Sequence, residues 1–537
     1  MPNRWQCEEQ RYQGKLTSYG LNRKVPAFGS RRLPNSNILR RLLFIVSDQK
    51  KGMVNVKIRT TAAMAPAASW RSPSTLAGSL EWVGTIATSP VALVLLWAMA
   101  LAHFASILAA LPGHARELDF SHYYVSAWAL RQGHDPYSTN LAPIGRKLDL
   151  RLAFSNPKFA KLDHLGAITQ GCYPPTFLLC FELLTLLRPA TAYWVWDGIT
   201  IAALAAALFL LLGPPSGLKA KTALAALALA LIFWPLGVHF YWAQSQILIL
   251  LLLIGMARLM KRRHAAWAGL SLAAAVRLRG FPIFIIGYLA VRRRWRELLY
   301  TASALAAGGL LTLVLVGVHS SFDFVRGVRY VTSPMWLETS DNVALASFIL
   351  RLFRSFGGPP TLSVEIARQA VTWLARLMIL GLTIQATVVS KPDQADDDWR
   401  GLSLWLAAMI LLSPTAWTHY LVILLFPYAA MVASASHGRA SSRAAAMIIL
   451  SYVLTSARWV LIIIDHFHLG AHALFRQDDW LFFAVIGQCA FMSLLSAWLG
   501  CYWWTVDGAA VRTRKIEEPA EPFEAVFGLE AVTGPQR

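Results

Sequence analysis

The sequence predicts an all-α polytopic membrane protein, and three observations of composition and patterning carry this expectation. The 537-residue chain is 56% hydrophobic and only 15% charged, whereas soluble domains carry about 25% charged residues. Apolar runs recur from Ser89 to Trp504, and a run of roughly 20 residues is long enough to cross a bilayer as a helix. The alternating segments of a membrane barrel, roughly ten residues each, are not visible. We therefore expect a helical bundle with about twelve transmembrane helices.

Residues 1–80 are expected to form a basic, disordered arm on the cytoplasmic side. They hold 14 Lys and Arg against 3 Asp and Glu, so they supply +11 of the formal charge of +21. A basic flank before the first hydrophobic helix is typical of a segment retained in the cytoplasm, and contact with anionic headgroups is a second interpretation. We expect no nucleic-acid partner, because no folded reader domain accompanies the charge. Met64 is a candidate natural start, because a more usual lead into a membrane protein follows it.

Residues 81–505 contain the predicted transmembrane domain. Its apolar segments, in chain order, are 89–111, 173–187, 190–212, 222–237, 247–260, 265–276, 281–291, 298–318, 367–389, 402–412, 421–433, 444–464 and 481–504. The segment 173–187 is short and opens with two prolines, so we do not count it as a full crossing. The polar tail, residues 506–537, is expected to be disordered and cytoplasmic.

Short basic loops set the predicted topology. By the positive-inside rule, the loops at 261–264, 292–296 and 437–443 are cytoplasmic. Both termini are then cytoplasmic as well. The long polar stretch 113–172 becomes the first outer loop, and the loops at 238–246, 277–280, 319–366, 413–420 and 465–479 lie on the same outer face.

The first outer loop carries a candidate catalytic carboxylate. From Phe120 to Leu130 the apolar residues recur with helical spacing, which predicts an amphipathic helix lying on the membrane surface. Asp119 stands at its start. The simpler interpretation is an N-cap, because aspartate commonly caps helices. The functional interpretation is a base at the water–lipid boundary that takes a proton from a bound hydroxyl.

Two arginines lie between short apolar pieces. Arg277 and Arg279 fall at the tip of the predicted hairpin 265–291, on the outer side. Arginine at such depth is costly and is usually functional, and its planar fork is suited to phosphate. Snorkelling to lipid headgroups is the alternative. We favour a phosphate site, because the positive-inside rule argues against two arginines at an outer turn.

Other outer helix ends offer amides and aromatic rings. The stretches 240–246, 341–351 and 411–420 combine the stacking faces and hydrogen-bonding groups that a sugar ring needs, although an interfacial aromatic belt explains each one alone. The histidines of 465–472 lack the spacing of a zinc motif, and the five cysteines form no C-x-x-C pair. No phosphate-binding loop, dinucleotide fingerprint or serine-hydrolase elbow is present, so nucleotide-driven chemistry is not indicated.

Taken in order, several stretches resemble the polyprenyl-phosphate-dependent mannosyltransferases of glycosyltransferase family 87, a branch of the GT-C superfamily. These stretches are LDFSHYYVSAWALRQGHDPYS, YPPTFLLCFELL, YWAQSQILILLLL, WAGLSLAAAVRLRGFPIFIIGYLAVRRRWR, DNVALASFILRLF and SPTAWTHYLVILL. Three positions depart from the family pattern. Asn342 is followed by Val343 and Ala344, whereas a serine often follows the asparagine of the family's later loop motif. Ala243 stands where a glycine usually precedes the glutamine, and Arg277 or Arg279 stands where a lysine usually precedes the proline.

The resemblance implies a GT-C-type bundle whose long first outer loop carries an acidic catalytic residue. Carried over, Asp119 is the general base, and Arg277 or Arg279 binds the donor phosphate. The residues implied for substrate contacts are Tyr124, Tyr173, Gln244, Asn342 and His419. The implied donor is a polyprenyl-phosphate sugar, usually mannose, used without a metal or other cofactor. The implied acceptor is a glycolipid or glycan at the outer face of the bacterial cytoplasmic membrane. A multi-pass transporter or lipid flippase is the alternative function.

Overall fold

The computed structural model describes residues 88–114, 118–152, 173–213, 218–331, 334–337, 341–355, 361–390, 395–437, 439–468 and 488–517. Within these ranges every regular element is a helix, and the one β-type pairing is an isolated antiparallel bridge between Asn342 and Trp417. The all-helical fold class is therefore confirmed for this part of the chain. The predicted arm 1–80 and the tail from 518 onward lie outside the described residues.

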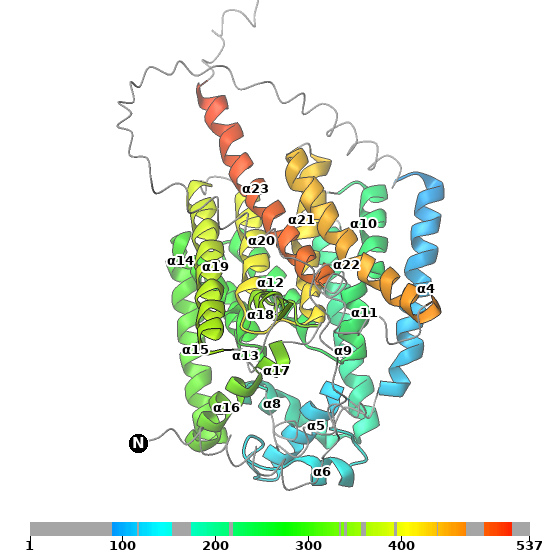
Figure 1. The fold of residues 1–537 in the computed structure, drawn as a ribbon, viewed down its shortest axis with the longest axis vertical. Helices are drawn as coiled ribbons and strands as arrows, with labels where there is room; N and C mark the ends of the chain where they lie inside the picture. The colour runs from blue at the N-terminus through cyan, green and yellow to red at the C-terminus, as the bar shows by residue number, and fades with distance from the viewer. Residues whose placement is uncertain are drawn as a thin grey trace, which may run out of the picture. The chain divides into compact units, whose positions relative to one another are not determined.

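The helices follow the order of the predicted apolar segments (Figure 1). They are α4 (Pro90–His114), α5 (Leu118–Arg131), α6 (Ala142–Lys147), α8 (Pro175–Phe181), η3 (Glu182–Leu186), α9 (Pro189–Leu212), α10 (Ala220–Ile232), α11 (Trp234–Tyr241), α12 (Gln246–Lys261), α13 (Ala265–Leu278), η5 (Phe281–Phe284), α14 (Ile285–Val291), α15 (Trp295–Val316), α16 (Val318–Val331), α17 (Pro334–Leu337), α18 (Leu345–Ser355), α19 (Leu362–Val389), α20 (Ala395–Leu412), η6 (Thr418–Leu424), α21 (Leu425–Ser436), α22 (Ser442–His468) and α23 (Cys489–Glu517).

Six of the described helices are long and apolar enough to cross a membrane, or seven if one bent pair counts as a span. The bent pair is α10 with α11, which meet at an angle of 47°. Other apolar helices, among them α13, are shorter than a full crossing. The membrane character is thus confirmed, whereas the expected twelve crossings stay a prediction.

Proline accounts for the break between α10 and α11. Pro235 is the second residue of α11, and a proline has no N–H to continue the ladder of the preceding helix. Phe233 between the two helices leaves helical geometry, with ψ of 111°. The chain therefore turns at this point, and α11 leads into the turn at 242–245 that precedes α12.

The helix predicted at 120–130 exists as α5, but it does not expose a polar face. Phe120 and Tyr123 are buried as the spacing predicted, and Ser121, Val125 and Ser126 on other faces are buried as well. The reason is that α6, α8 and η3 pack around α5, and Figure 1 shows α5, α6 and α8 together at one end of the bundle. The position expected for α5, on a membrane surface with one face in water, is therefore not confirmed.

Two further regions are helical beyond the predicted apolar segments. The polar stretch after 318 is largely helical, because it contains α16, α17 and α18. The last helix, α23, continues to Glu517, past the boundary at 505 where the disordered tail was expected to begin. Arg443 pairs with Asp507 in the first turn beyond that boundary, so the helix has a polar contact where hydrophobic patterning alone predicts its end.

Candidate active site

Asp119 is the second residue of α5, and its carboxylate is held by side chains from two distant segments. The Tyr173 hydroxyl donates to Oδ1 at 2.9 Å, and the Gln244 amide Nε2 donates to Oδ2. Asp119 therefore lies inside α5 and is not the N-cap before it. Its side-chain partners, Tyr173 and Gln244, belong to segments far from α5 in the sequence. The positive end of the helix dipole also favours a negative charge at this position. The carboxylate is partly buried and held from both sides.

Gln244 lies in a turn whose backbone is unusual. The residue before it, Ala243, has φ of +49°, in the left-handed region that costs an L-residue about 1–2 kcal/mol. The Trp196 indole donates to the Ala243 carbonyl at 2.8 Å, and the Gln244 N–H donates to the His239 carbonyl at 3.0 Å. A glycine at position 243 would adopt this conformation freely, which gives a physical reason for the family's usual Gly-Gln. The turn aims the fully buried Gln244 side chain at Asp119.

Arg279 completes the cluster. It follows the last residue of α13 in an extended conformation, with φ of −152° and ψ of 132°. Its Nη2 donates to the Gln244 Oε1 and to the Tyr123 hydroxyl, each at 2.8 Å, and its guanidinium carbon lies 4.6 Å from the centre of the Tyr173 ring. The amide of Gln244 therefore links the arginine to the carboxylate, because its oxygen accepts from Arg279 while its nitrogen donates to Asp119.

Arg277 has a different environment from Arg279. Its Nη2 donates to the Leu305 carbonyl of α15, and its guanidinium lies against Gly308 and Gly309, where a Cβ would come within 3.2 and 3.0 Å of it. Of the two candidate phosphate ligands, Arg279 is thus the one that the structure brings next to Asp119. Arg277 instead fastens the end of α13 to α15.

Of the other residues predicted from the sequence, some lie in or near this cluster and others lie outside it. Tyr173 lies in the cluster, and His419 is buried within electrostatic range of Arg279. Tyr124 points elsewhere, donating to the Leu187 carbonyl at 2.6 Å. Asn342 is fully buried, and its side chain donates to the Trp336 carbonyl and accepts from the N–H groups of 344 and 416. These hydrogen bonds join the segments around 342 and 416, and none of them involves a side chain of the cluster.

The electrostatics of the cluster favour a carboxylate that can exchange a proton. Burial raises the pKa of Asp119 above its ordinary value of 3.8, while Arg279, His122 and the two hydrogen bonds oppose that rise. Burial also lowers the pKa of His122, against the opposing effect of Asp119. The His122 Nε2 contacts the Leu152 carbonyl at 2.8 Å. A raised carboxyl pKa moves the group toward the range in which it works as a general base.

Three side chains of the cluster were not singled out by their sequence. Tyr123 donates to Gln244, Ser245 accepts from Arg279 at 3.3 Å, and His239 is fully buried within electrostatic range of Arg279. Helical spacing offered a signal for one of them, because Tyr123 is four residues after Asp119 on the same face of α5. Among the described residues, no group of three or more His, Cys, Asp or Glu could hold a metal ion.

The fold and this cluster define a class of protein: a polytopic helical membrane protein with a carboxylate and an arginine brought together at helix breaks. Residues 172–414 match the family model described as Glycosyltransferase family 87. This match supports the family that the sequence resemblance indicated, and with it a membrane glycosyltransferase as the class of protein. The matched region includes Tyr173, Gln244 and Arg279, whereas Asp119 precedes it. Comparisons with curated proteins and with solved structures found no match.

Proposed function

We propose that this protein transfers a sugar, with mannose the first candidate, from a polyprenyl-phosphate donor to a glycolipid or glycan acceptor. We place the reaction at the outer face of a bacterial cytoplasmic membrane, with inversion at the anomeric carbon. The observation that carries the proposal is the Asp119–Gln244–Arg279 chain of hydrogen bonds. This chain links a carboxylate to a guanidinium, and a glycosyl transfer from a phosphate needs a base and a cation.

The chemical step uses the two charged ends of this chain. The acceptor hydroxyl oxygen forms a bond to the anomeric carbon while its proton passes to the Asp119 carboxylate. The bond from the anomeric carbon to the donor phosphate oxygen breaks, and its electron pair leaves with the polyprenyl phosphate. The growing negative charge on that phosphate is stabilised by the Arg279 guanidinium, whose planar fork suits phosphate oxygens. One carboxylate suffices, because phosphate leaves readily, whereas glycoside hydrolysis commonly uses a second carboxyl group.

The neighbouring side chains hold both charged groups in place. Tyr173 contributes twice, since its hydroxyl donates to Asp119 and its ring lies under Arg279. The Tyr173 backbone is fixed in turn, because the Tyr137 hydroxyl donates to its carbonyl at 2.8 Å. Such preorganisation matters because the site must not reorganise as charge develops. In this scheme His419 and Tyr124 remain candidates for substrate contacts, and Asn342 shapes the loops around the site.

The test uses the purified full chain in nanodiscs with radiolabelled polyprenyl-phosphate mannose and a host membrane lipid extract. The variant is Asp119→Asn. The matched control is Asp149→Asn, because Asp149 is exposed in the same loop and its φ of +56° is one that asparagine also accepts. We expect label to move into a new glycolipid, at a rate about 10²–10⁴-fold lower in Asp119→Asn and unchanged in the control.

Two outcomes would contradict the proposal in different ways. Transfer that survives Asp119→Asn would keep the enzyme but assign the base to another group, with His419 the next candidate. Folded wild-type protein that transfers no label from any lipid-phosphate sugar would refute the proposed donor and acceptor and favour the transporter or flippase alternative. A counterflow assay of labelled lipid in sealed vesicles would then test that alternative directly.

A further inference from the structure

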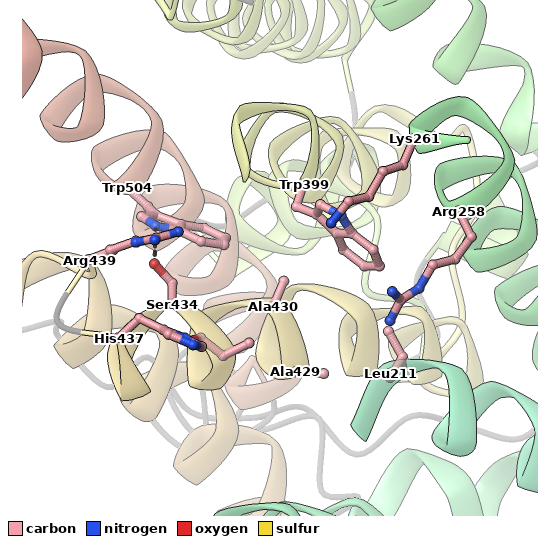
Figure 2. Close-up of a pocket in the computed structure, with 11 residues that line it drawn as sticks. Leu211, Arg258, Lys261, Trp399, Ala429, Ala430, Ser434, His437, Arg439 and Trp504 are labelled. Carbon is pink, nitrogen blue, oxygen red and sulfur yellow. Dashed lines mark hydrogen bonds between the residues drawn. The ribbon is translucent and has the colours of Figure 1, made fainter. Parts of the chain in front are cut away.

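A cavity of about 250 Å³, drawn in Figure 2, lies toward the end of the bundle opposite to α5, the helix that carries Asp119 (Figure 1). The helix α12 connects the two regions, because it begins next to Ser245 in the cluster and ends at Lys261 in the cavity wall. Its sixteen residues separate the two ends by roughly 22 Å at 1.5 Å per residue. The described lining includes Arg258, Lys261, Trp399, Ala433, Arg439 and Trp504.

The charged residues of this lining all have the same sign. Arg258 and Lys261 come from α12, and Arg439 follows α21, whereas none of the described lining residues is acidic. Two described carboxylates outside the lining are paired with arginines that are also outside it, Asp398 with Arg294 and Asp507 with Arg443. The described lining of the cavity therefore carries positive charge and no negative charge.

Aromatic and small side chains give the cavity a fixed form. Trp399 stacks on Phe426 with ring centres 4.7 Å apart and carries the Arg258 guanidinium 5.1 Å above its ring. Trp504 donates to the Ser434 hydroxyl at 3.2 Å. Figure 2 shows Trp504 and Trp399 along one side of α21, with the alanines of α21 between them. These small side chains leave the volume open.

We propose that this cavity binds the phosphate headgroup of an anionic membrane lipid, at the membrane face opposite to the Asp119 site. Arg and Lys are the side chains that bind phosphate, and tryptophan is enriched where protein meets the headgroup layer. The volume falls below the roughly 300–1,000 Å³ of pockets for drug-sized ligands, so it suits a headgroup whose acyl chains stay outside. Two basic loops predicted to be cytoplasmic, 261–264 and 437–443, contribute to the wall, which agrees with a leaflet rich in anionic lipid.

The test measures lipid retained by the full chain in native mass spectrometry. The protein is purified in detergent and titrated with phosphatidylglycerol, with phosphatidylcholine or with inorganic phosphate. Lys261→Gln removes one lining cation, and Arg262→Gln is its control, because Arg262 is exposed on the same turn and does not line the cavity. Ala433→Leu fills part of the cavity, and Ala435→Leu is its control on the exposed side of α21.

We expect one phosphatidylglycerol to be retained with about fivefold lower affinity in Lys261→Gln and a larger loss in Ala433→Leu. The two control variants should bind as the wild type does, and phosphatidylcholine should bind weakly to all. Equal phosphatidylglycerol binding by all variants would overturn the proposal. Inorganic phosphate that binds as tightly as phosphatidylglycerol would overturn the lipid assignment in favour of a soluble phosphate. None of these results depends on glycosyl transfer, so a failure of the lipid proposal would leave the proposed function unaffected.

Discussion

Replacing Arg279 with glutamine, and separately Arg277 with glutamine, tests whether the hydrogen-bonded chain performs the reaction. The substitutions are identical and two residues apart, but the environments differ. Arg279 donates to Tyr123, to Gln244 and to Ser245, all within 3.3 Å, whereas Arg277 donates to a backbone carbonyl of α15. Only the first arginine is within reach of charge that develops beside Asp119.

The expected magnitudes follow from these contacts. Loss of one preorganised donor at a developing oxyanion lowers kcat by about 10²–10³-fold, so we expect that loss for Arg279→Gln. Arg277→Gln removes one charge-assisted bond to a carbonyl, which is worth about 1.5–3 kcal/mol of stability, and should leave kcat within a few-fold of the wild type. The assay is transfer of labelled mannose by purified protein in nanodiscs, with thermal unfolding measured on the same samples. Equal loss of kcat in both variants, with both folded, would refute the reasoning.

Three further perturbations address the same cluster. The acid limb of kcat/KM should lie above the ordinary carboxyl pKa of 3.8, with activity gained as pH rises, and should move to higher pH in Arg279→Gln because Arg279 lowers the pKa of Asp119. If the pH–rate profile of Arg279→Gln keeps its acid limb at the wild-type position, Arg279 does not lower the pKa of the group that controls the rate. Tyr173→Phe removes one hydrogen bond to the carboxylate and should lower transfer by about tenfold or more while the protein stays folded, and an unchanged rate would contradict this role. Ala243→Val forces a β-branched side chain into φ of +49° and should lower the unfolding temperature and the transfer rate. Ala243→Gly should retain both. Equal stability of the two variants would show that the turn is not strained.

Much of the fold could be predicted because hydrophobic length is a strong signal. The apolar segments from 190 to 464 recur in order as helices, since a backbone in lipid must satisfy its own hydrogen bonds. The number of crossings is less certain, because α13 and α14 are short and a hydropathy pattern does not show whether such a piece crosses. The environment of α5 was missed for another reason. Ser121 and Ser126 of α5 are buried. A pattern of polar residues in a sequence does not show whether such side chains face protein or water.

The candidate site was predictable in its residue types but not in its geometry. Asp119, Gln244 and Arg279 were all singled out, although 125 residues separate the first two and 35 the last two. The choice between the two arginines could not be made, because it depends on where α13 ends. Arg277 is inside the helix and faces α15, whereas Arg279 is extended and turns toward Gln244. Asn342 shows that an amide at a predicted outer loop can hold backbone groups together, and its substrate contact stays a prediction.

The positions of the helix breaks explain why the site lies where it does. Non-helical backbone at membrane depth is tolerated only where it is buried in protein or lines a cavity. The turn after α11 presents Gln244, the end of α13 presents Arg279, and the 3-10 turn η6 presents His419. A continuous helix at any of these points would direct the side chain along a helix face instead of toward a shared centre. The bent pair α10 and α11 and the short helix α13, which make the crossing count hard to predict, therefore lead directly into Gln244 and Arg279. A sequence search for such breaks would point to this candidate site without a catalytic motif.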